Sequence, residues 1–209
     1  MNIAVLGASF DPSHNGHLKV ARNILKSKRI NKIMLMPVNI HPFAKKLTKA
    51  SHRLAMAKLL EEKLRTSSVH GKNIEVSDLE LRKNSTSFSI DTLQALKQKF
   101  SKDKFYWIIG SDNLDKFTKW KDWQKIIKDF GLIVVARDTR SHLRGGVAPA
   151  AHLAGENRSK NIIILKAKDF APLDISSSEI RKRVKEGKKI GNLVPKKVEE
   201  YIIQNNLYK

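Results

Sequence analysis

Short apolar runs alternate along the chain with longer segments in which apolar residues return every three or four positions. The runs read NIAVLGA, NKIMLMPV, NIEVSDLEL, KFYWIIGS, GLIVVAR and NIIILKA, at residues 2–8, 31–38, 73–81, 104–111, 131–137 and 161–167. Four of them are almost continuously apolar, which favours strands that are covered on both faces, as in a parallel sheet.

Segments with the helical period lie between these runs: GHLKVARNILKSK, SHRLAMAKLLEEKL and SIDTLQALKQKF, at residues 16–28, 51–64 and 89–100. Such alternation is typical of an α/β protein whose parallel strands are joined by right-handed crossovers. We therefore predict an open α/β sheet with helices on both faces.

Two further helices are expected after the last strand. Ser176, with Glu179 three residues on, has the spacing of a capping box, so the first helix should begin there and end near Gly187. Pro195 suits the first position of the second helix. Three residues of that helix would share one face: Val198, Tyr201 and Ile202.

The chain is expected to form a single domain over residues 1–209, with a sheet core at about 1–170 and a helical part at about 175–209. The segment 138–160 has glycines, a proline and no clear period, which indicates a surface loop. The sequence contains no internal repeat, no low-complexity tract and no linker long enough to divide the chain.

Composition limits the choice of chemistry. The chain has no cysteine, which excludes disulfides, thiolate metal sites and cysteine nucleophiles. No run reaches the roughly 18 apolar residues needed to cross a bilayer, and the first run has no basic leader, so we expect a cytoplasmic protein with no membrane partner. The sequence leaves a homo-oligomer open.

The net charge of +21 favours an anionic partner through long-range attraction. It does not choose between nucleic acid, nucleotide phosphates and acidic lipid, and many of the lysines are typical of a solvated surface.

The first candidate site is GASFDPSHN, the loop after the first predicted strand. Open α/β folds bind ligands at this edge of the sheet, and a helix that starts there offers free N–H groups and a positive dipole end to a phosphate. His14 falls in the loop and His17 in the first helical turn, while Gly16 keeps the backbone slim for a phosphate to approach.

Other interpretations of this loop stay open. His14 could cap a turn while His17 packs on the helix, or the pair could hold a metal, for which Asp11 is the one carboxylate nearby. The loop lacks the glycines of the dinucleotide fingerprint and the Gly-Lys-Ser/Thr of a P-loop.

A second candidate anion site is ISSSEIR, residues 175–181, where serines precede a helix and Arg181 follows on the next turn. It comes after the last predicted strand, at the same sheet edge as the histidines. Two phosphate sites on one edge suit a triphosphate or two phosphorylated substrates.

A third segment, IIGSDNLDKFTKW, ends a strand at Gly110 and then presents Asp112 and Trp120. Trp107 within the strand is expected in the core, whereas Trp120 or Trp123 could stack on a flat ring.

Together these motifs resemble one family. GASFDPSHNGH is similar to the G-G-T/S-F-D-P-x-H-x-G-H signature of the H-x-G-H nucleotidyltransferases, and ISSSEIR is similar to their I-S-S-T-x-I-R. Within that superfamily HRLAMAKLL, DLELRKNSTSFSIDTL, FYWIIGSDNLDKFTKW and the closing LVPKKVEEYI…LY resemble bacterial nicotinate-nucleotide adenylyltransferases.

The resemblance implies a Rossmann-like nucleotidyltransferase fold and a reaction that joins nicotinate mononucleotide to the AMP part of ATP, with Mg²⁺. It implies that His14, His17 and Arg181 act on the ATP phosphates. It further implies an ATP site of Gly7, Ala8, Ser9, Phe10, Gly110, Ile175, Ser176 and Ser177, and a nicotinate-nucleotide site of Lys45, Ser87, Phe88, Ser89, Asp112 and Trp120.

The sequence departs from the family pattern at a few positions. Phe88 and Ser89 replace tyrosine and threonine, and VNIHPFAKK leaves the substrate-side lysine open between Lys45 and Lys46. The alternatives are a related adenylyltransferase acting on nicotinamide mononucleotide or phosphopantetheine, a nucleotide-binding module without activity, and a basic nucleic-acid-binding protein; we expect no specific nucleic-acid partner.

Overall fold

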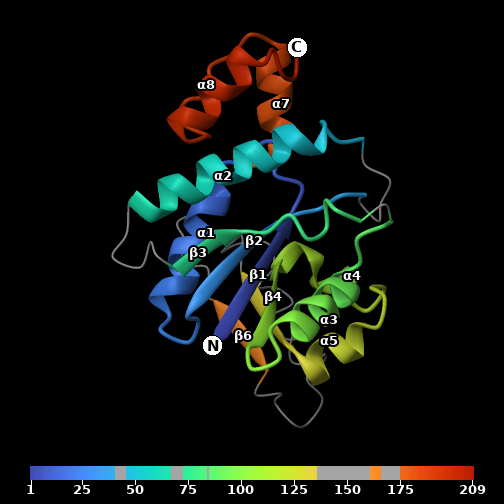
Figure 1. Cartoon of the computed structure of the whole chain (residues 1–209). Helices are drawn as coiled ribbons and strands as arrows, with labels where there is room; N and C mark the ends of the chain where they lie inside the picture. Colours follow the sequence, from blue (N-terminus) through green and yellow to red (C-terminus); the bar gives the residue numbers. More distant parts are fainter. Residues whose placement is uncertain (41–45, 67–72, 84, 136–160, 166–174) are drawn as a thin grey trace.

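The computed structural model describes residues 1–40, 46–66, 73–83, 85–135, 161–165 and 175–209. Its strands are β1 (Asn2–Ala8), β2 (Lys32–Pro37), β3 (Ile74–Val76), β4 (Lys104–Gly110), β5 (Gly131–Val135) and β6 (Ile162–Leu165). They form one sheet in the order β3-β2-β1-β4-β5-β6, and every adjacent pair is parallel. The predicted open parallel sheet is confirmed (Figure 1).

One strand is shorter than predicted. β3 ends at Val76, whereas the alternating pattern extended to residue 81. The backbone from Asp78 onward forms local turns instead, with Arg82 N–H donating to Asp78 O at 3.2 Å and Lys83 N–H to Glu80 O at 3.1 Å. The alternation beyond Val76 therefore belongs to a turn that buries Glu80 and not to a strand.

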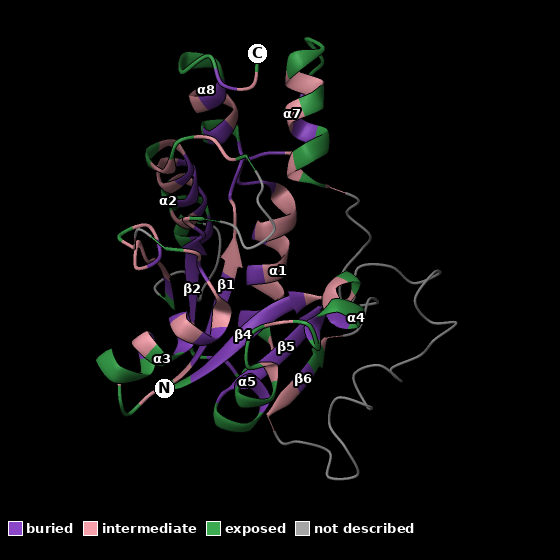
Figure 2. Ribbon diagram, turned by 90° about the vertical axis from the view of Figure 1, so that its right-hand side faces the viewer, coloured by how far each residue is buried: buried purple, intermediate pink, exposed green. Residues whose placement is uncertain are grey.

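Helices cover both faces of the sheet, as predicted, because apolar side chains leave the strands on alternate sides. One face packs against α1 (Asn15–Lys26) and α2 (Ala50–Thr66), and the other against α3 (Ser89–Lys99), α4 (Leu114–Phe117) and α5 (Trp123–Asp129). The strands lie buried between these layers (Figure 2). The sequence pattern did not predict α4 and α5, since 4 and 7 residues are too few to show a helical period.

The C-terminal helices α7 (Ser177–Lys185) and α8 (Lys196–Gln204) lie beyond the carboxyl ends of the strands, next to α2 (Figure 1). Ser176 caps α7 as predicted, and Gly187 follows its end with a φ of +66°. Pro195 is the N-cap of α8, one position before the predicted one. The apolar face of α8 is buried on α2 in a cluster that includes Met56, Val198 and Ile202.

Neighbouring strands β1 and β4 form the switch point of the sheet, because the chain continues to β2 on one side and to β5 on the other. Ligands of open α/β sheets bind outside the carboxyl ends of the strands at such a point. The histidine loop follows β1, and the 3₁₀ helix η2 (Ser111–Asn113) follows β4. None of the helices in the described ranges is long and apolar enough to cross a membrane.

The single-domain organisation stays a prediction. The segment 138–160, predicted to be a loop, lies outside the described residues.

Candidate active site

The loop between β1 and α1 is anchored in the core. Phe10, Asp11 and Ser13 are almost fully buried, and His14 is 7% exposed. Phe10 adopts a left-handed backbone conformation with a φ of 49°, which turns the chain sharply at the end of β1. A buried loop of this kind presents its side chains in fixed positions.

The two histidines form a reciprocal cap at the start of α1. His14 Nδ1 accepts the N–H of Gly16 at 3.2 Å, and His17 Nδ1 accepts the N–H of His14 at 3.2 Å. The two rings stack, with centroids 3.8 Å apart. Because both Nδ1 atoms accept a hydrogen bond, both rings are neutral and carry their hydrogen on Nε2 as a donor. The capping interpretation of His14 is therefore confirmed, and it fixes the orientation of both rings.

Two glycines near the loop are required by neighbouring rings. A Cβ on Gly16 would lie 2.8 Å from His14 Nδ1, so the absent Cβ leaves room for the ring of His14. A Cβ on Gly7 would lie 2.3 Å from the ring of Trp107. Trp107 is buried, as predicted, and Gly7 makes room for it.

The second anion site contacts the first directly. Ser177 Oγ donates to Pro12 O at 3.0 Å, and Arg181 Nη1 donates to Asp11 O at 2.6 Å. Ser176 Oγ caps α7 by accepting the N–H of Glu179 at 3.2 Å. The chain thus brings together the histidine loop and the start of α7, although about 165 to 170 residues separate them.

Two helix N-termini converge here. α1 has 12 residues and α7 has 9, so each contributes the positive end of its dipole. The first N–H groups of α1 are already bonded, since Asn15 donates to Leu193 O at 2.8 Å and Gly16 to His14 Nδ1 at 3.2 Å. Ile175 O lies 3.8 Å from the position of a Cβ on Gly16, which places the two helix starts side by side. The arrangement favours an extended anion more than a single small one.

A buried polar network that the sequence analysis did not identify holds the loop from behind. Asp11 Oδ1 accepts the hydroxyl of Tyr208 at 2.7 Å, and Asp11 Oδ2 accepts the N–H of Thr48 at 3.1 Å. Arg53, on α2, is 2% exposed and donates to Thr48 O at 2.9 Å and to Ser9 O at 3.1 Å. Since both Asp11 oxygens accept protein donors, the predicted alternative of a metal held by Asp11 and the histidines does not fit.

Burial acts on the pKa of two groups in this network. It lowers the pKa of the Arg53 guanidinium, an effect opposed by the charge of Asp11. It raises the pKa of the Tyr208 phenol, and the hydrogen bond to Asp11 raises it further. Tyr208 therefore remains a hydroxyl donor at neutral pH.

The sequence of α2 contains one indication of the buried polar network around Asp11. Arg53 occupies a position on the buried face of α2, in line with Met56, Ala57, Leu60 and Leu64. A charged residue in an apolar stripe requires polar partners. Nothing in the local pattern identifies Tyr208 as one of those neighbours.

On the face of the sheet opposite α1, the entry to α3 is formed by Ser87, Phe88 and Ser89. Ser87 N–H donates to Ile40 O at 3.1 Å, and Ser87 Oγ accepts the N–H of Asn39 at 3.3 Å. Phe88 is the N-cap of α3, and its side chain has no group that can cap. Ser87 therefore fixes the turn, while the first N–H groups of α3 begin at Ser89.

Lys121, the residue after Trp120, contacts this entry. Lys121 Nζ contacts Asp91 Oδ1 at 2.8 Å and lies 5.1 Å from the ring centroid of Phe88. Trp120 itself is half-buried and packs on Phe117, with ring centroids 5.4 Å apart. The sequence analysis did not identify Lys121, which joins two of the predicted substrate-site segments.

The remaining predicted site residues lie in various positions. Gly110 ends β4 beside β1, and Asp112 is exposed in η2. Lys46 is exposed, and Lys45 lies outside the described residues.

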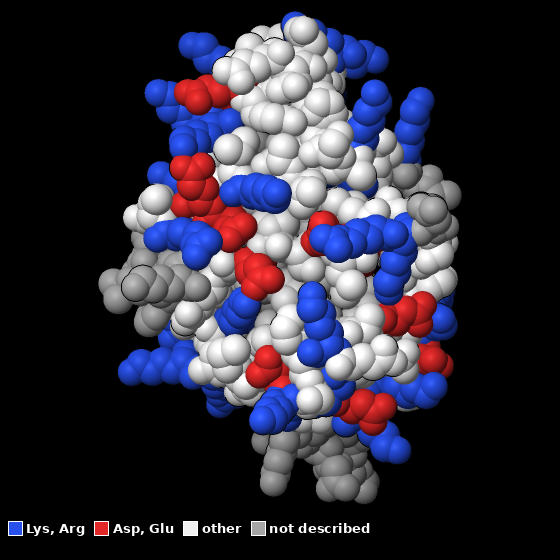
Figure 3. Space-filling model, viewed as in Figure 1, with Lys and Arg blue, Asp and Glu red and all other residues white. Residues whose placement is uncertain are grey.

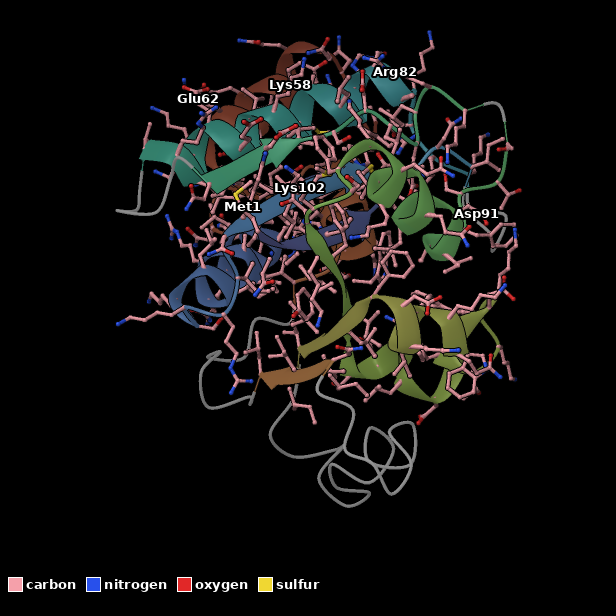
Figure 4. All side chains as sticks on the ribbon, turned by 60° about the horizontal axis from the view of Figure 1, so that its bottom comes forward. Met1, Lys58, Glu62, Arg82, Asp91 and Lys102 are labelled. Carbon is pink, nitrogen blue, oxygen red and sulfur yellow. The ribbon has the colours of Figure 1, made fainter. Side chains whose placement is uncertain are left out.

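Surface charge does not concentrate on the face seen in Figure 3, where acidic residues lie among the lysines and arginines. Lys197 pairs with Glu62 and Lys121 with Asp91; both acidic residues are labelled on the outer sides of helices in Figure 4. Pairs of this kind are typical of a solvated surface.

Comparison with known proteins connects this geometry to a family. A model of the cytidylyltransferase-like family matches residues 5–183. The chain is 35% identical over 214 residues to a "Probable nicotinate-nucleotide adenylyltransferase" of Dictyoglomus thermophilum, with 100% of both chains covered. It is 34% identical over 208 residues to a protein of the same name from Methylacidiphilum infernorum, with 99% of this chain and 91% of that one covered.

Among solved structures, nicotinic acid mononucleotide adenylyltransferase of Plasmodium falciparum, complexed with NaAD, matches with a TM-score of 0.77. The match covers 99% of this chain and 97% of that chain at 24% identity, which shows a common fold.

Proposed function

The chain belongs to the cytidylyltransferase-like family and, within it, to the nicotinate-nucleotide adenylyltransferases, and from this membership we propose that it joins nicotinate mononucleotide to the AMP part of ATP. The products are deamido-NAD and pyrophosphate, a step of NAD biosynthesis. One observation supports the site assignment above all: Arg181, on α7, donates to Asp11 O at 2.6 Å, so two phosphate-binding helix starts form one site.

ATP phosphates fit between the two helix starts. Because their Nδ1 atoms accept backbone N–H groups, His14 and His17 keep their Nε2–H groups as donors. Arg181 and the first N–H groups of α7 supply further donors and positive charge. Donors held in place before the reaction stabilise charge that grows on the departing pyrophosphate.

The chemistry needs no protein nucleophile or base. A phosphate oxygen of nicotinate mononucleotide attacks the α-phosphorus of ATP, a new P–O bond forms, and the bond to the bridging oxygen of pyrophosphate breaks. The attacking group is already an anion, so no proton has to be removed. The residues contribute by positioning the two substrates and by stabilising charge.

The entry to α3 suits the nicotinate carboxylate. Its first N–H groups begin at Ser89, and Phe88 leaves them without a side-chain cap of its own. A carboxylate is stabilised at a helix N-terminus more than a neutral amide is. Trp120, whose neighbour Lys121 contacts Asp91 and the ring of Phe88 at this entry, offers an aromatic face for the pyridine ring.

Magnesium fits this site as a companion of ATP. Within the described ranges, no three histidine, aspartate or glutamate side chains are grouped to hold a metal. Mg²⁺ commonly keeps several waters and binds substrate phosphates, and in that role it would neutralise charge on the triphosphate. Arg181 and the two histidines would then contact the phosphate oxygens that the ion leaves exposed.

The test is an assay of pyrophosphate release from ATP and Mg²⁺ with nicotinate mononucleotide, nicotinamide mononucleotide and phosphopantetheine in parallel. We expect the highest kcat/KM with nicotinate mononucleotide. Preference for either of the other acceptors would reassign the substrate, and absence of turnover with all three, together with salt-sensitive duplex binding, would favour the nucleic-acid alternative.

A further inference from the structure

We propose that Tyr208 is a positioning residue for the ATP phosphate site, acting through Asp11 on the loop that carries His14 and His17. The proposal rests on the function proposed above for that loop. It assigns to the segment after α8 a part in the reaction, although Tyr208 itself does not contact the groups expected to bind phosphate.

Tyr208 and Asp11 are joined by a hydrogen bond between their side chains. Tyr208 donates its hydroxyl to Asp11 Oδ1 at 2.7 Å, while Thr48 N–H donates to Asp11 Oδ2 at 3.1 Å. Asp11 is 1% exposed, so water cannot readily replace either donor. A buried carboxylate oxygen that loses its donor must find another, and the peptide that bears it moves accordingly.

The backbone at Asp11 and Pro12 is bonded to α7. Its carbonyl oxygen accepts Arg181 Nη1 at 2.6 Å, and the next carbonyl, that of Pro12, accepts Ser177 Oγ at 3.0 Å. His14 follows two residues later. The backbone of Asp11 and Pro12 therefore links the histidine loop to Arg181 and the start of α7, and Tyr208 holds the side chain of Asp11.

Tyr208 is held in place by the packing of the segment after α8. Leu207 is buried in the cluster that α8 forms with Met56, and its N–H donates to Ile202 O at 3.0 Å. Tyr208 has a φ of +67°, a left-handed conformation that an L-residue adopts only when the surroundings hold it. The hydroxyl is therefore presented to Asp11 from a fixed backbone.

The chain offers a matched control in Tyr201. Its hydroxyl also joins the C-terminal segment to α2, at 2.9 Å from His52 Nδ1, but it does not contact the histidine loop. Tyr208→Phe and Tyr201→Phe each remove one hydroxyl from the same packed region. Comparison of the two separates an effect on the site from a general loss of packing.

The experiment measures steady-state kinetics and the imidazole ¹⁵N spectrum of both variants and of the unmutated protein, well below their unfolding midpoints. For Y208F we expect the KM for ATP to rise about tenfold, since a hydrogen bond to a buried charge is lost. The KM for nicotinate mononucleotide should stay within about twofold, because its proposed site is at the entry to α3; partial unfolding would instead change both KM values. Y201F should match the unmutated protein in both KM values.

The ¹⁵N spectrum tests the proposal without any assay of activity. In the unmutated protein the Nδ1 atoms of His14 and His17 should show the unprotonated, hydrogen-bonded signal, and in Y208F at least one should shift toward the average of the two tautomers. Y208F with unchanged spectrum and unchanged KM for ATP would overturn the proposal. If the unmutated protein shows no turnover, the proposed function fails and the spectrum alone decides the positioning role.

If Y208F does not fold, replacement of Tyr208 by 4-aminophenylalanine supplies a ring of the same shape with an N–H donor. Normal KM for ATP and a normal ¹⁵N spectrum are then expected. A folded 4-aminophenylalanine protein with the tenfold rise in KM would contradict the assignment of the donor role.

Discussion

The ring of His14 lies over Gly16, with its Nδ1 atom accepting the Gly16 N–H at 3.2 Å and only 2.8 Å from where a Cβ would stand. A glycine in the first turn of a helix usually costs stability relative to alanine. Here the absent Cβ makes room for a ring in the proposed ATP site, so its addition should affect activity more than folding.

Gly16→Ala is therefore expected to fold normally and to lose about 10²-fold in kcat/KM, because the displaced His14 ring misplaces its donor by a fraction of an ångström or more. Thermal unfolding and steady-state kinetics check both parts. Gly191→Ala is the control, since its Cβ would meet only the mobile carboxylate end of Glu199 at 3.0 Å. Full activity of Gly16→Ala would contradict this prediction, because it would show that the His14 ring can shift without losing its function.

His17→Ala should abolish most of the pyrophosphate release while the fold remains. The loss of one fixed donor to a developing charge typically costs about 10² to 10³ in kcat, and the lost helix cap costs about 1 kcal/mol of stability. His52→Ala removes a histidine from α2 that contacts Tyr201 and should leave kcat near normal. Near-normal turnover of folded His17→Ala would refute the role given to this histidine.

Arg181→Lys should lower kcat/KM for ATP by about tenfold or more, because an ammonium group cannot reproduce the planar set of donors that reaches both Asp11 O and a phosphate. Arg183→Lys on the same helix is the matched control, since Arg183 pairs with Glu179 at 2.9 Å. If Arg181→Lys lowers kcat/KM no more than the control does, the positive charge alone is sufficient and the geometry of the guanidinium is not required.

Trp120→Leu should raise the KM for nicotinate mononucleotide about fivefold and leave the KM for ATP unchanged, since aromatic contacts contribute about 1 kcal/mol beyond their burial. Trp123→Leu is its control, because both indoles are half-buried and pack on the ring of Phe117, at 5.4 and 6.0 Å. A larger effect of Trp123→Leu would instead assign the stacking on the pyridine ring to Trp123, in α5.

Glu80→Gln should change how stability depends on pH. Burial raises the pKa of Glu80 above its ordinary value of 4.5, although hydrogen bonds from Thr92 and Ser87 oppose the rise. Above pH 4.5 the unfolded chain loses this proton first, so the free energy of unfolding falls as pH rises until Glu80 ionises in the folded protein as well. The glutamine variant has no such decrease.

Urea unfolding from pH 4 to pH 8 measures this difference, with Glu62→Gln as a control at an exposed, paired carboxylate. Parallel stability curves for Glu80→Gln and the unmutated protein would contradict the raised pKa.

Much of the fold could be predicted because its signals are local. The buried strands are continuous apolar runs, and α1, α2, α3, α7 and α8 each show a helical period or a cap. The predicted strand at β3 was too long because Leu79 and Leu81 flank Glu80 in an alternating pattern. These residues form a turn in which Glu80 is buried, and alternation alone cannot distinguish such a turn from a strand.

The candidate site was predictable in its outline for a similar reason. The rule that parallel strands end at one edge placed His14 and Arg181 at the same edge before any geometry was known, and in the structure Arg181 contacts the loop that carries His14. The bond from Tyr208 to Asp11 spans 197 residues and depends on how α8 packs on α2, so no local pattern contains it.

That long span has a consequence for the synthesis of the protein. While the ribosome is still adding residues 177–208, the sheet can already have formed around β1 and β4, but the loop lacks Ser177, Arg181 and Tyr208 as partners. Nascent chains that lack these residues should therefore not join ATP to nicotinate mononucleotide, and competence should arise only when α7 and α8 have emerged and docked. A chain that stalls during translation would fold in part and remain catalytically silent.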